Sequence, residues 1–269
     1  MADVIDPFDE FKANQRAMWA SFAPTATFTT PTAAKLVKFA AITAGERVLD
    51  VGTGTGVVAV TAARAGAQVT GLDLTPALLG HARENAQLAG VSVTWQEGDA
   101  EQLPFADGSF DVVVSQFGHM FAPRPAHAVA EMRRVLKPGG RVAFSTWPPE
   151  HLVGRMFALM ARYAPPPPPG AAAPPLWGSP AVVAERLGAA FDAPFFSREV
   201  MYFPALSLGH FRAFMEHSIG PMQKTVQRLE AADPAALATL RAEFEALAAP
   251  YHEGNLIHQH YLLTRARAR

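Results

Sequence analysis

Short apolar runs alternate with helix-like segments between residues 46 and 147, and this alternation restricts the fold more than any other feature of the chain. The predicted strands are Arg47–Val51, Gln68–Leu72, Val91–Gln96, Phe110–Ser115 and Arg141–Ser145. Helix-like segments lie between them, such as Val57–Ala65, Pro76–Ala89 and Ala126–Leu136. Strands and helices that alternate at this spacing predict an α/β fold, in which a parallel sheet is covered by helices on both faces.

The composition changes after Trp147. A run of five prolines, Pro165–Pro169, cannot continue a helix and predicts a stiff surface connector. Beyond it we expect a short helix at Pro180–Gly188 and a strand at Arg198–Phe203. Helices should follow over Leu208–Ala249, with breaks near Gly220-Pro221 and Pro234. The last segment, Leu256–Thr264, is β-like. We therefore expect a core at 1–149, a connector, sixth strand and helical lid at 150–255, and a last strand with a basic tail at 256–269.

Charge and cysteine content exclude several classes of function. The net charge of −1 gives no general attraction to nucleic acid or to an anionic membrane. The chain has no cysteine, which excludes disulfides, zinc–thiolate sites and a thiolate nucleophile. Met1–Glu10 does not resemble a targeting segment, and no apolar run is long enough to span a membrane. We expect a soluble, cytoplasmic protein that does not bind nucleic acid, and its oligomeric state stays open.

Three glycines follow the first predicted strand. The strand ends with the acidic residue Asp50 and with Val51, and the glycines follow at positions 52, 54 and 56. Such a loop places backbone N–H groups near a polar ligand, although it can also be a tight turn without a ligand. A dinucleotide site would need G-x-G-x-x-G, which this spacing does not match. A carboxylate at Asp50 would repel phosphate and could accept hydrogen bonds from a cationic ligand.

Four motifs occur in a fixed order: "VLDVGTGTG", "VTGLDLT", "EGDAEQLPFADGSFDVV" and "LKPGG". Together they resemble class I S-adenosylmethionine-dependent methyltransferases, in the small-molecule group that includes the quinone-biosynthesis C-methyltransferases. The resemblance implies a doubly wound, mostly parallel sheet of seven strands with a helical lid. It also implies that the last strand, near Leu256–Thr264, is antiparallel to its neighbours.

The same resemblance assigns cofactor contacts. The first loop would wrap the methionine part of S-adenosylmethionine, Asp73 would bind the ribose hydroxyls, and Asp99 with Ala100 would contact adenine. Asp73 could instead cap the following helix, and Asp99 could be a turn residue. Ser115 and Gln116 end the fourth strand, at the edge where open α/β sheets bind ligands. The expected cofactor-binding residues are Asp50, Gly52, Thr53, Gly54, Gly56, Asp73, Leu74, Asp99, Ala100, Ser115 and Gln116, with Trp19 and Phe28 from an N-terminal arm, whereas Phe22 is expected to pack in the core.

His119 follows the fourth strand and is the expected catalytic residue. It could remove a proton from the methyl acceptor or orient that molecule, or it could be an ordinary loop histidine. His258 and His260 would share one face of the last strand, which we interpret as a packed or solvated face rather than a metal site. The arginines at 265, 267 and 269 are expected to form a solvated tail.

Apolar side chains are frequent in the predicted lid. Phe157, Met160, Phe211, Phe214 and Met215 are examples, and most such residues must belong to the core. A few could form an apolar acceptor pocket, which would suit a hydrophobic or aromatic small molecule. The acceptor atom, whether oxygen, nitrogen, sulfur or carbon, stays open. The alternative function is a protein that binds the cofactor without catalysis, as a sensor or assembly partner.

Overall fold

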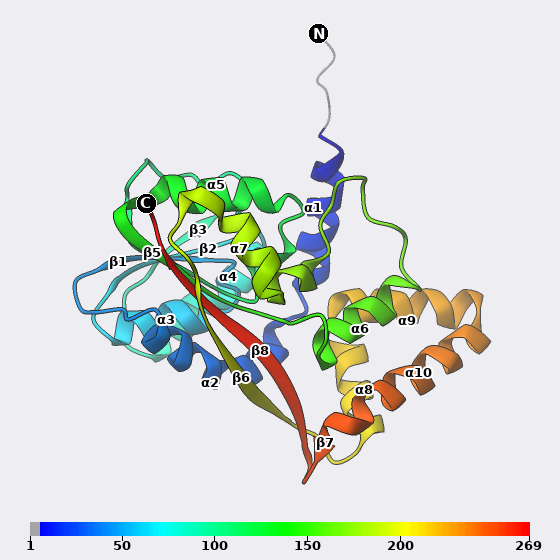
Figure 1. The fold of residues 1–269 in the computed structure, drawn as a ribbon. Coiled ribbons are helices and arrows are strands. Elements are labelled where there is room, and N and C mark those ends of the chain that lie inside the picture. Colours follow the sequence, from blue (N-terminus) through cyan, green and yellow to red (C-terminus); the bar gives the residue numbers. More distant parts are fainter. Residues whose placement is uncertain (1–5) are drawn as a thin grey trace.

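The protein folds around one twisted sheet (Figure 1). The computed structural model describes residues 6–269. The main path of the sheet runs β3-β2-β1-β4-β5-β8-β6, and the short strand β7 pairs with β8. The strands are β1 (Arg47–Val51), β2 (Gln68–Asp73), β3 (Thr94–Glu97), β4 (Phe110–Gln116), β5 (Leu136–Thr146), β6 (Phe195–Pro204), β7 (His252–Glu253) and β8 (Leu256–Arg267).

The pairing of the strands confirms the predicted doubly wound, mostly parallel architecture. β1 to β5 pair in parallel, while β8 is antiparallel to both β5 and β6. The carboxyl ends of β1, β2, β3 and β4 therefore meet at one edge of the sheet. The last strand lies inside the sheet, between β5 and β6, as predicted.

Helices cover both faces of the sheet and form a separate group beside one edge (Figure 1). Figure 1 shows α5 and α7 on one side of the sheet and α2 and α3 on the other. Many of these helices begin at a proline, whose fixed φ suits the first helical position. The helices are α1 (Pro7–Trp19), α2 (Ala23–Phe39), α3 (Val57–Arg64), α4 (Pro76–Leu88), α5 (Pro125–Val135), α6 (Leu152–Ala161), α7 (Pro180–Leu187), α8 (Leu208–Ser218), α9 (Gly220–Ala232) and α10 (Pro234–Ala248), with short 3₁₀ turns at His119–Phe121 (η1), Pro174–Gly178 (η2), Gly188–Ala190 (η3) and Ala249–Tyr251 (η4).

Two apolar clusters hold these layers together. The first surrounds the parallel strands and includes Leu49, Val113 and Phe144. The second lies among α6, α8, α9 and α10 and includes Phe211 and Phe244. The lid helices thus have a core of their own, because each buries an apolar stripe against the others.

The described end of the chain differs from the predicted solvated tail. β8 continues to Arg267, and Arg265 Nη1 donates a hydrogen bond to the Phe39 carbonyl oxygen at 2.8 Å. Arg269 Nε donates to Asp192 at 2.8 Å. The segment therefore pairs as a strand up to Arg267, because Ala266 and Ala268 are buried, while Arg267 and Arg269 are exposed to solvent as predicted.

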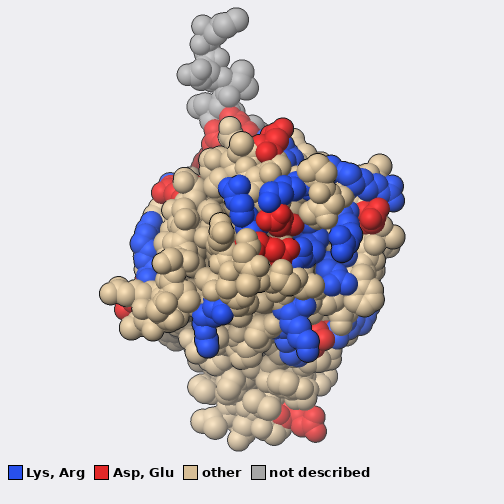
Figure 2. All heavy atoms as spheres, turned by 90° about the vertical axis from the view of Figure 1, so that its left-hand side faces the viewer, with Lys and Arg blue, Asp and Glu red and all other residues tan. Residues whose placement is uncertain are grey.

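Within residues 6–269, none of the helices combines the length and apolar character that crossing a membrane requires. Figure 2 shows one face of the molecule, on which Lys and Arg side chains lie beside Asp and Glu side chains in several places. Ion pairs of this kind include Lys137 with Asp111 and Arg141 with Glu46.

Candidate functional site

A cavity of about 270 Å³ lies where the carboxyl ends of β1, β2 and β4 meet the N-terminal and lid helices. Its lining divides into two parts. The polar half comes from α1 and from the loops after β1, β2 and β3, and is formed by Lys12, Asp50, Gly52, Thr53, Gly54, Thr55, Asp73, Leu74, Thr75, Gly98, Asp99 and Ala100. The apolar half comes from α2, α6, α8, α9, β6 and β8, and includes Phe22, Thr25, Phe28, Met156, Phe157, Met160, Met201, Phe203, Met215, Met222 and Gln259.

The glycine loop needs its glycines for different reasons. Gly52 has φ +66°, and a Cβ there would lie 2.8 Å from the Gly118 Cα, so the loops after β1 and β4 touch. Gly54 has φ +55° and faces open space in the cavity. Gly56 does not line the cavity, since a Cβ there would lie 2.7 Å from the Trp95 ring. The structure thus corrects the prediction for Gly56, which allows close packing of α3.

Asp50 is a buried carboxylate that is only half satisfied. Its Oδ2 accepts hydrogen bonds from Thr53 Oγ1 at 2.6 Å and from the Ala59 N–H at 3.1 Å. Its Oδ1 is buried and has no partner among the described residues. Burial raises the pKa of the Asp50 carboxyl to about 7. A cationic group in the cavity would favour the ionised form, because an opposite charge offsets the cost of burial.

Asp73 connects the loops after β1 and β2. Its Oδ2 accepts a hydrogen bond from the Gly54 N–H at 2.7 Å, and its Oδ1 accepts one from the Thr75 N–H at 2.8 Å. Burial raises the pKa of this carboxyl above its usual range. The residue in the N-cap position of α4 is Thr75, so Asp73 is not the helix cap that was considered as an alternative.

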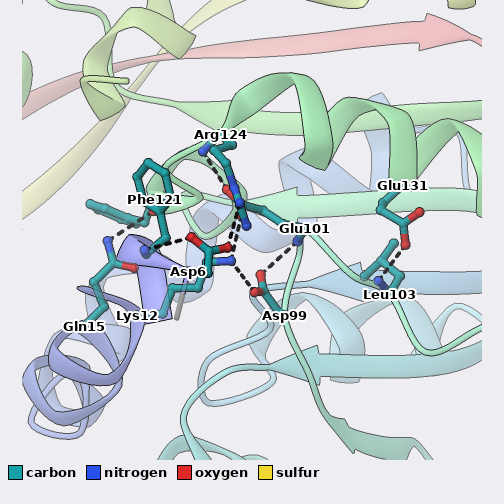
Figure 3. A network of polar contacts seen from close by, with 10 residues as sticks. Asp6, Lys12, Gln15, Asp99, Glu101, Leu103, Phe121, Arg124 and Glu131 are labelled. Atoms are coloured by element: carbon teal, nitrogen blue, oxygen red, sulfur yellow. Dashed lines mark hydrogen bonds and ion pairs between the residues drawn. The ribbon is translucent and has the colours of Figure 1, made fainter. Parts of the chain in front are cut away.

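Asp99 belongs to an ion-pair network at the polar end of the cavity (Figure 3). Lys12 Nζ of α1 lies 2.6 Å from both Asp99 Oδ2 and Glu101 Oε2. Arg124 pairs with the same Glu101 carboxylate at 2.7 Å and with Asp6 at 2.8 Å. The Glu101 side chain is only 1% exposed, so the network is anchored in the protein interior. It fastens α1 over the loop that carries Asp99.

Comparison with known proteins identifies the family. A family profile described as a methyltransferase domain matches residues 49–144. An uncharacterised protein of Mycobacterium tuberculosis is 36% identical over 264 residues, which is 96% of this chain and 95% of that protein. Demethylmenaquinone methyltransferase of Thermus thermophilus is 42% identical over 108 residues, or 39% of this chain and 49% of that enzyme. The chain belongs to the class I S-adenosylmethionine-dependent methyltransferases.

A solved structure shares the fold of this chain. A phosphoethanolamine N-methyltransferase of Haemonchus contortus, in complex with S-adenosylhomocysteine, superposes with a TM-score of 0.52 at 20% identity. The match covers 87% of this chain and 51% of that one, and at this identity it shows the fold. The predicted resemblance to quinone C-methyltransferases is confirmed, and S-adenosylmethionine is the cofactor of this methyltransferase.

Two adjacent residues at the end of β4 have different roles in the methyltransferase. Ser115 Oγ donates to the Val51 carbonyl oxygen at 2.6 Å and accepts the His119 N–H at 2.9 Å. Ser115 does not line the cavity, so its predicted cofactor contact is corrected to a structural role. Gln116 does line it, and its amide is fixed by Thr29 and Thr32 of α2.

His119 does not fit the base role that the sequence suggested. His119 is among the residues that line the cavity, but it is only 1% exposed, with the ring centroid 4.5 Å from that of Phe144 and 4.6 Å from that of Trp177. Neither ring nitrogen has a hydrogen-bond partner among the described residues. Burial, with a smaller effect of the Arg186 charge, lowers the pKa of the imidazole to about 3. A base that weak cannot hold an acceptor's proton near neutral pH.

The N-terminal helices supply aromatic side chains to the cavity. Trp19 and Phe28 line it, as expected, and Phe28 packs against Phe203 at 4.1 Å between ring centroids. Phe22 also lines the cavity, which corrects the prediction that it only packs in the core. No sequence pattern indicated a role for Lys12, because its position beside Asp99 depends on how α1 packs against the loop after β3.

His258 and His260 lie on one face of β8, away from the cavity. His260 stacks on His151 with ring centroids 4.6 Å apart, and His258 meets Tyr202 edge-on at 5.0 Å. Within residues 6–269 no group of three His, Asp or Glu side chains could hold a metal ion. This face of the strand is a packed surface of rings.

Proposed function

We propose that this methyltransferase transfers the methyl group of S-adenosylmethionine to a small hydrophobic or aromatic molecule. The apolar half of the cavity carries the proposal. Five of the nine methionines line it, together with several phenylalanines. Methionine is flexible and polarisable, and it adapts to irregular apolar ligands. Such a lining favours a ligand that is mostly apolar.

The hydrogen-bond donors and acceptors in the polar half of the cavity match those of S-adenosylmethionine. Asp73 would accept hydrogen bonds from the ribose hydroxyls, and Asp99 with Ala100 would contact the adenine. The loop from Asp50 to Gly54 would enclose the methionine part, with the unsatisfied Asp50 Oδ1 facing its cationic groups. The remaining proposed contacts are Thr53, Leu74, Gln116, Trp19 and Phe28, all of which line the cavity.

The cofactor supplies a methyl group on a sulfonium, which is a good leaving group. The residues of this chain then have to align the acceptor and exclude water. The lid and the aromatic side chains of α1 and α2 enclose the cavity, and Gln116 is held in one orientation by two partners in α2. Because His119 is buried and neutral, we assign no general base.

The test is a screen of candidate acceptors for S-adenosylhomocysteine production. The panel contains phenols, quinols, thiols and amines of similar size. Quinols are included because the Thermus relative is a demethylmenaquinone methyltransferase. We expect turnover with at least one apolar or aromatic acceptor and none with small charged amines. Cofactor binding without turnover of any acceptor would contradict the proposal.

A further inference from the structure

Strand β8 carries one polar side chain into the apolar half of the cavity. Gln259 is 4% exposed and lines the cavity, although both of its neighbours, His258 and His260, face the other side of the sheet. Side chains alternate between the two faces of a strand, so Gln259 must point opposite to these rings. Its partner across the ladder, Met201 of β6, lines the cavity as well.

The position of Gln259 lies beyond the edge of the parallel sheet. Thr146, the last residue of β5, pairs with Leu262, so β8 continues past β5 toward the lid. Gln259 is three residues further along, or roughly 10 Å at the rise of an antiparallel strand. This places it on the acceptor side, away from the loops after β1, β2 and β3 that form the polar half.

The surroundings of Gln259 make its amide unusual. The four charged side chains of the lining, Lys12, Asp50, Asp73 and Asp99, all belong to the polar half. The Gln259 amide makes no hydrogen bond to any residue between 6 and 269, in contrast to that of Gln116. The amide atoms of Gln259 are not among the fully buried polar atoms that lack a partner, so they stay accessible from the cavity, where a ligand can bond them.

A second polar group of the apolar half is also unsatisfied. Thr25 Oγ1 of α2 is buried, lines the cavity and has no hydrogen-bond partner within the described part of the chain. Thr25 is the third residue of α2, so no helical carbonyl lies one turn earlier to accept its hydroxyl, as one does for Thr30 and Thr61. Two separate elements thus present uncommitted, uncharged polar groups to an otherwise apolar space.

We propose that Gln259 is the residue that recognises the methyl acceptor, and that the acceptor is an uncharged, mainly apolar molecule with a hydroxyl or carbonyl oxygen. The amide N–H can donate to either kind of oxygen, and the amide carbonyl can accept from a hydroxyl. A charged acceptor would be desolvated here without a counter-ion, so carboxylates are rejected. This inference rests on the proposed function and narrows its substrate class.

The experiment measures binding rather than turnover. Equilibrium dialysis in saturating S-adenosylhomocysteine compares three probes of one shape: 2-naphthol, naphthalene and 2-naphthoate. We expect the wild type to bind 2-naphthol about two- to tenfold more tightly than naphthalene, the range for one net hydrogen bond, and to bind 2-naphthoate weakest of all. Gln259→Leu should reduce this preference for 2-naphthol to about one and leave naphthalene binding unchanged.

The matched control is His258→Leu, which changes the next residue of β8 on the outer face and should keep the preference. Gln259→Met repeats the test with an unbranched side chain, and retained S-adenosylhomocysteine affinity shows that each variant is folded. A preference that survives in both Gln259 variants overturns the proposal, as does a wild type that binds neither neutral probe. Because no step requires methyl transfer, the two proposals can fail separately: Gln259-dependent binding without turnover of any acceptor would reject the proposed function and keep Gln259 as the residue that binds a neutral ligand oxygen.

Discussion

Asp73 is held in place by the backbone N–H groups of Gly54 and Thr75, so its carboxylate is already oriented toward the polar half of the cavity. A fixed acceptor loses little freedom when a ribose binds, which favours affinity. Substitution of Asp73 should be costly, because the N–H groups of Gly54 and Thr75 would lose their acceptor in a buried place.

We expect Asp73→Asn to weaken S-adenosylmethionine binding at least tenfold. The reason is the loss of charge-assisted hydrogen bonds, worth about 1.5–3 kcal/mol each. Calorimetric titration measures the affinity, and a melting curve checks that the variant is folded. The control is Asp107→Asn, an exposed acid paired with Arg134. Equal affinity in the wild type and Asp73→Asn would remove Asp73 from the ribose site.

His119 makes a prediction about stability and pH. The buried imidazole has a folded pKa of about 3, below its unfolded value near 6.5. The unfolded chain therefore binds the proton first, and the stability that the neutral ring contributes is present above pH 6.5 and lost as the pH falls toward 3. As the pH falls through this range, the free energy of unfolding of the wild type should decrease, relative to that of His119→Leu, by about 1.4 kcal/mol for each pH unit.

Denaturant titrations at several pH values between 4 and 8 measure this difference, and Asp50, which is common to both proteins, cancels from it. His81→Leu, a change at an exposed histidine, provides the control. A difference between His119→Leu and wild type that does not vary with pH would show that His119 titrates normally.

Helix α1 is the element that closes the polar half of the cavity. Lys12, Gln15 and Trp19 all line the cavity from this helix, and the ion-pair network of Figure 3 fixes its position. Lys12 is 13% exposed and reaches two carboxylates, so its pairs are less screened by water than a surface ion pair would be.

We expect Lys12→Met to raise the dissociation rate of S-adenosylhomocysteine about tenfold or more. The substitution keeps an unbranched side chain that is only one atom shorter and removes the charge that pairs with Asp99 and Glu101. A chase experiment followed by tryptophan fluorescence measures the rate. Lys35→Met, which removes an exposed pair with Glu199 outside the cavity, is the matched control. The same rate in the two variants would show that the network does not retain the cofactor.

At the scale of the whole molecule, the cavity lies at the seam between the two apolar clusters. Along β6, Met201 belongs to the cluster of the sheet and Phe203 to that of the lid. Along β8, Tyr261 belongs to the cluster of the sheet and Ile257 to that of the lid, and Gln259 lies between these two residues. Because two paired strands cross this seam, sheet and lid are joined by a hydrogen-bonded ladder. The division into units at 1–149, 150–255 and 256–269 stays a prediction.

Local patterns in the sequence determined most of the architecture. The alternation of strands and helices, the breaks at Gly220-Pro221 and Pro234, and the last antiparallel strand follow from periodicity, from proline and glycine chemistry, and from the ordered motifs. The same motifs were enough to identify the family and the cofactor. Periodicity and helix breaks lie within a few neighbouring residues, so they can be recognised without knowledge of the fold, whereas the antiparallel last strand was expected from the family resemblance.

Contacts between distant segments decided what the individual residues do. Trp177, from the connector, packs edge-on against His119, and this burial lowers the pKa of a ring whose sequence position suggested a general base. Lys12 reaches Asp99 across 87 positions. The sequence drew attention to His258 and His260, while the pairing of β8 with β6 turned Gln259 toward the cavity. A side chain's role depends on burial and on partners that no local period encodes, so only the tertiary structure could assign it.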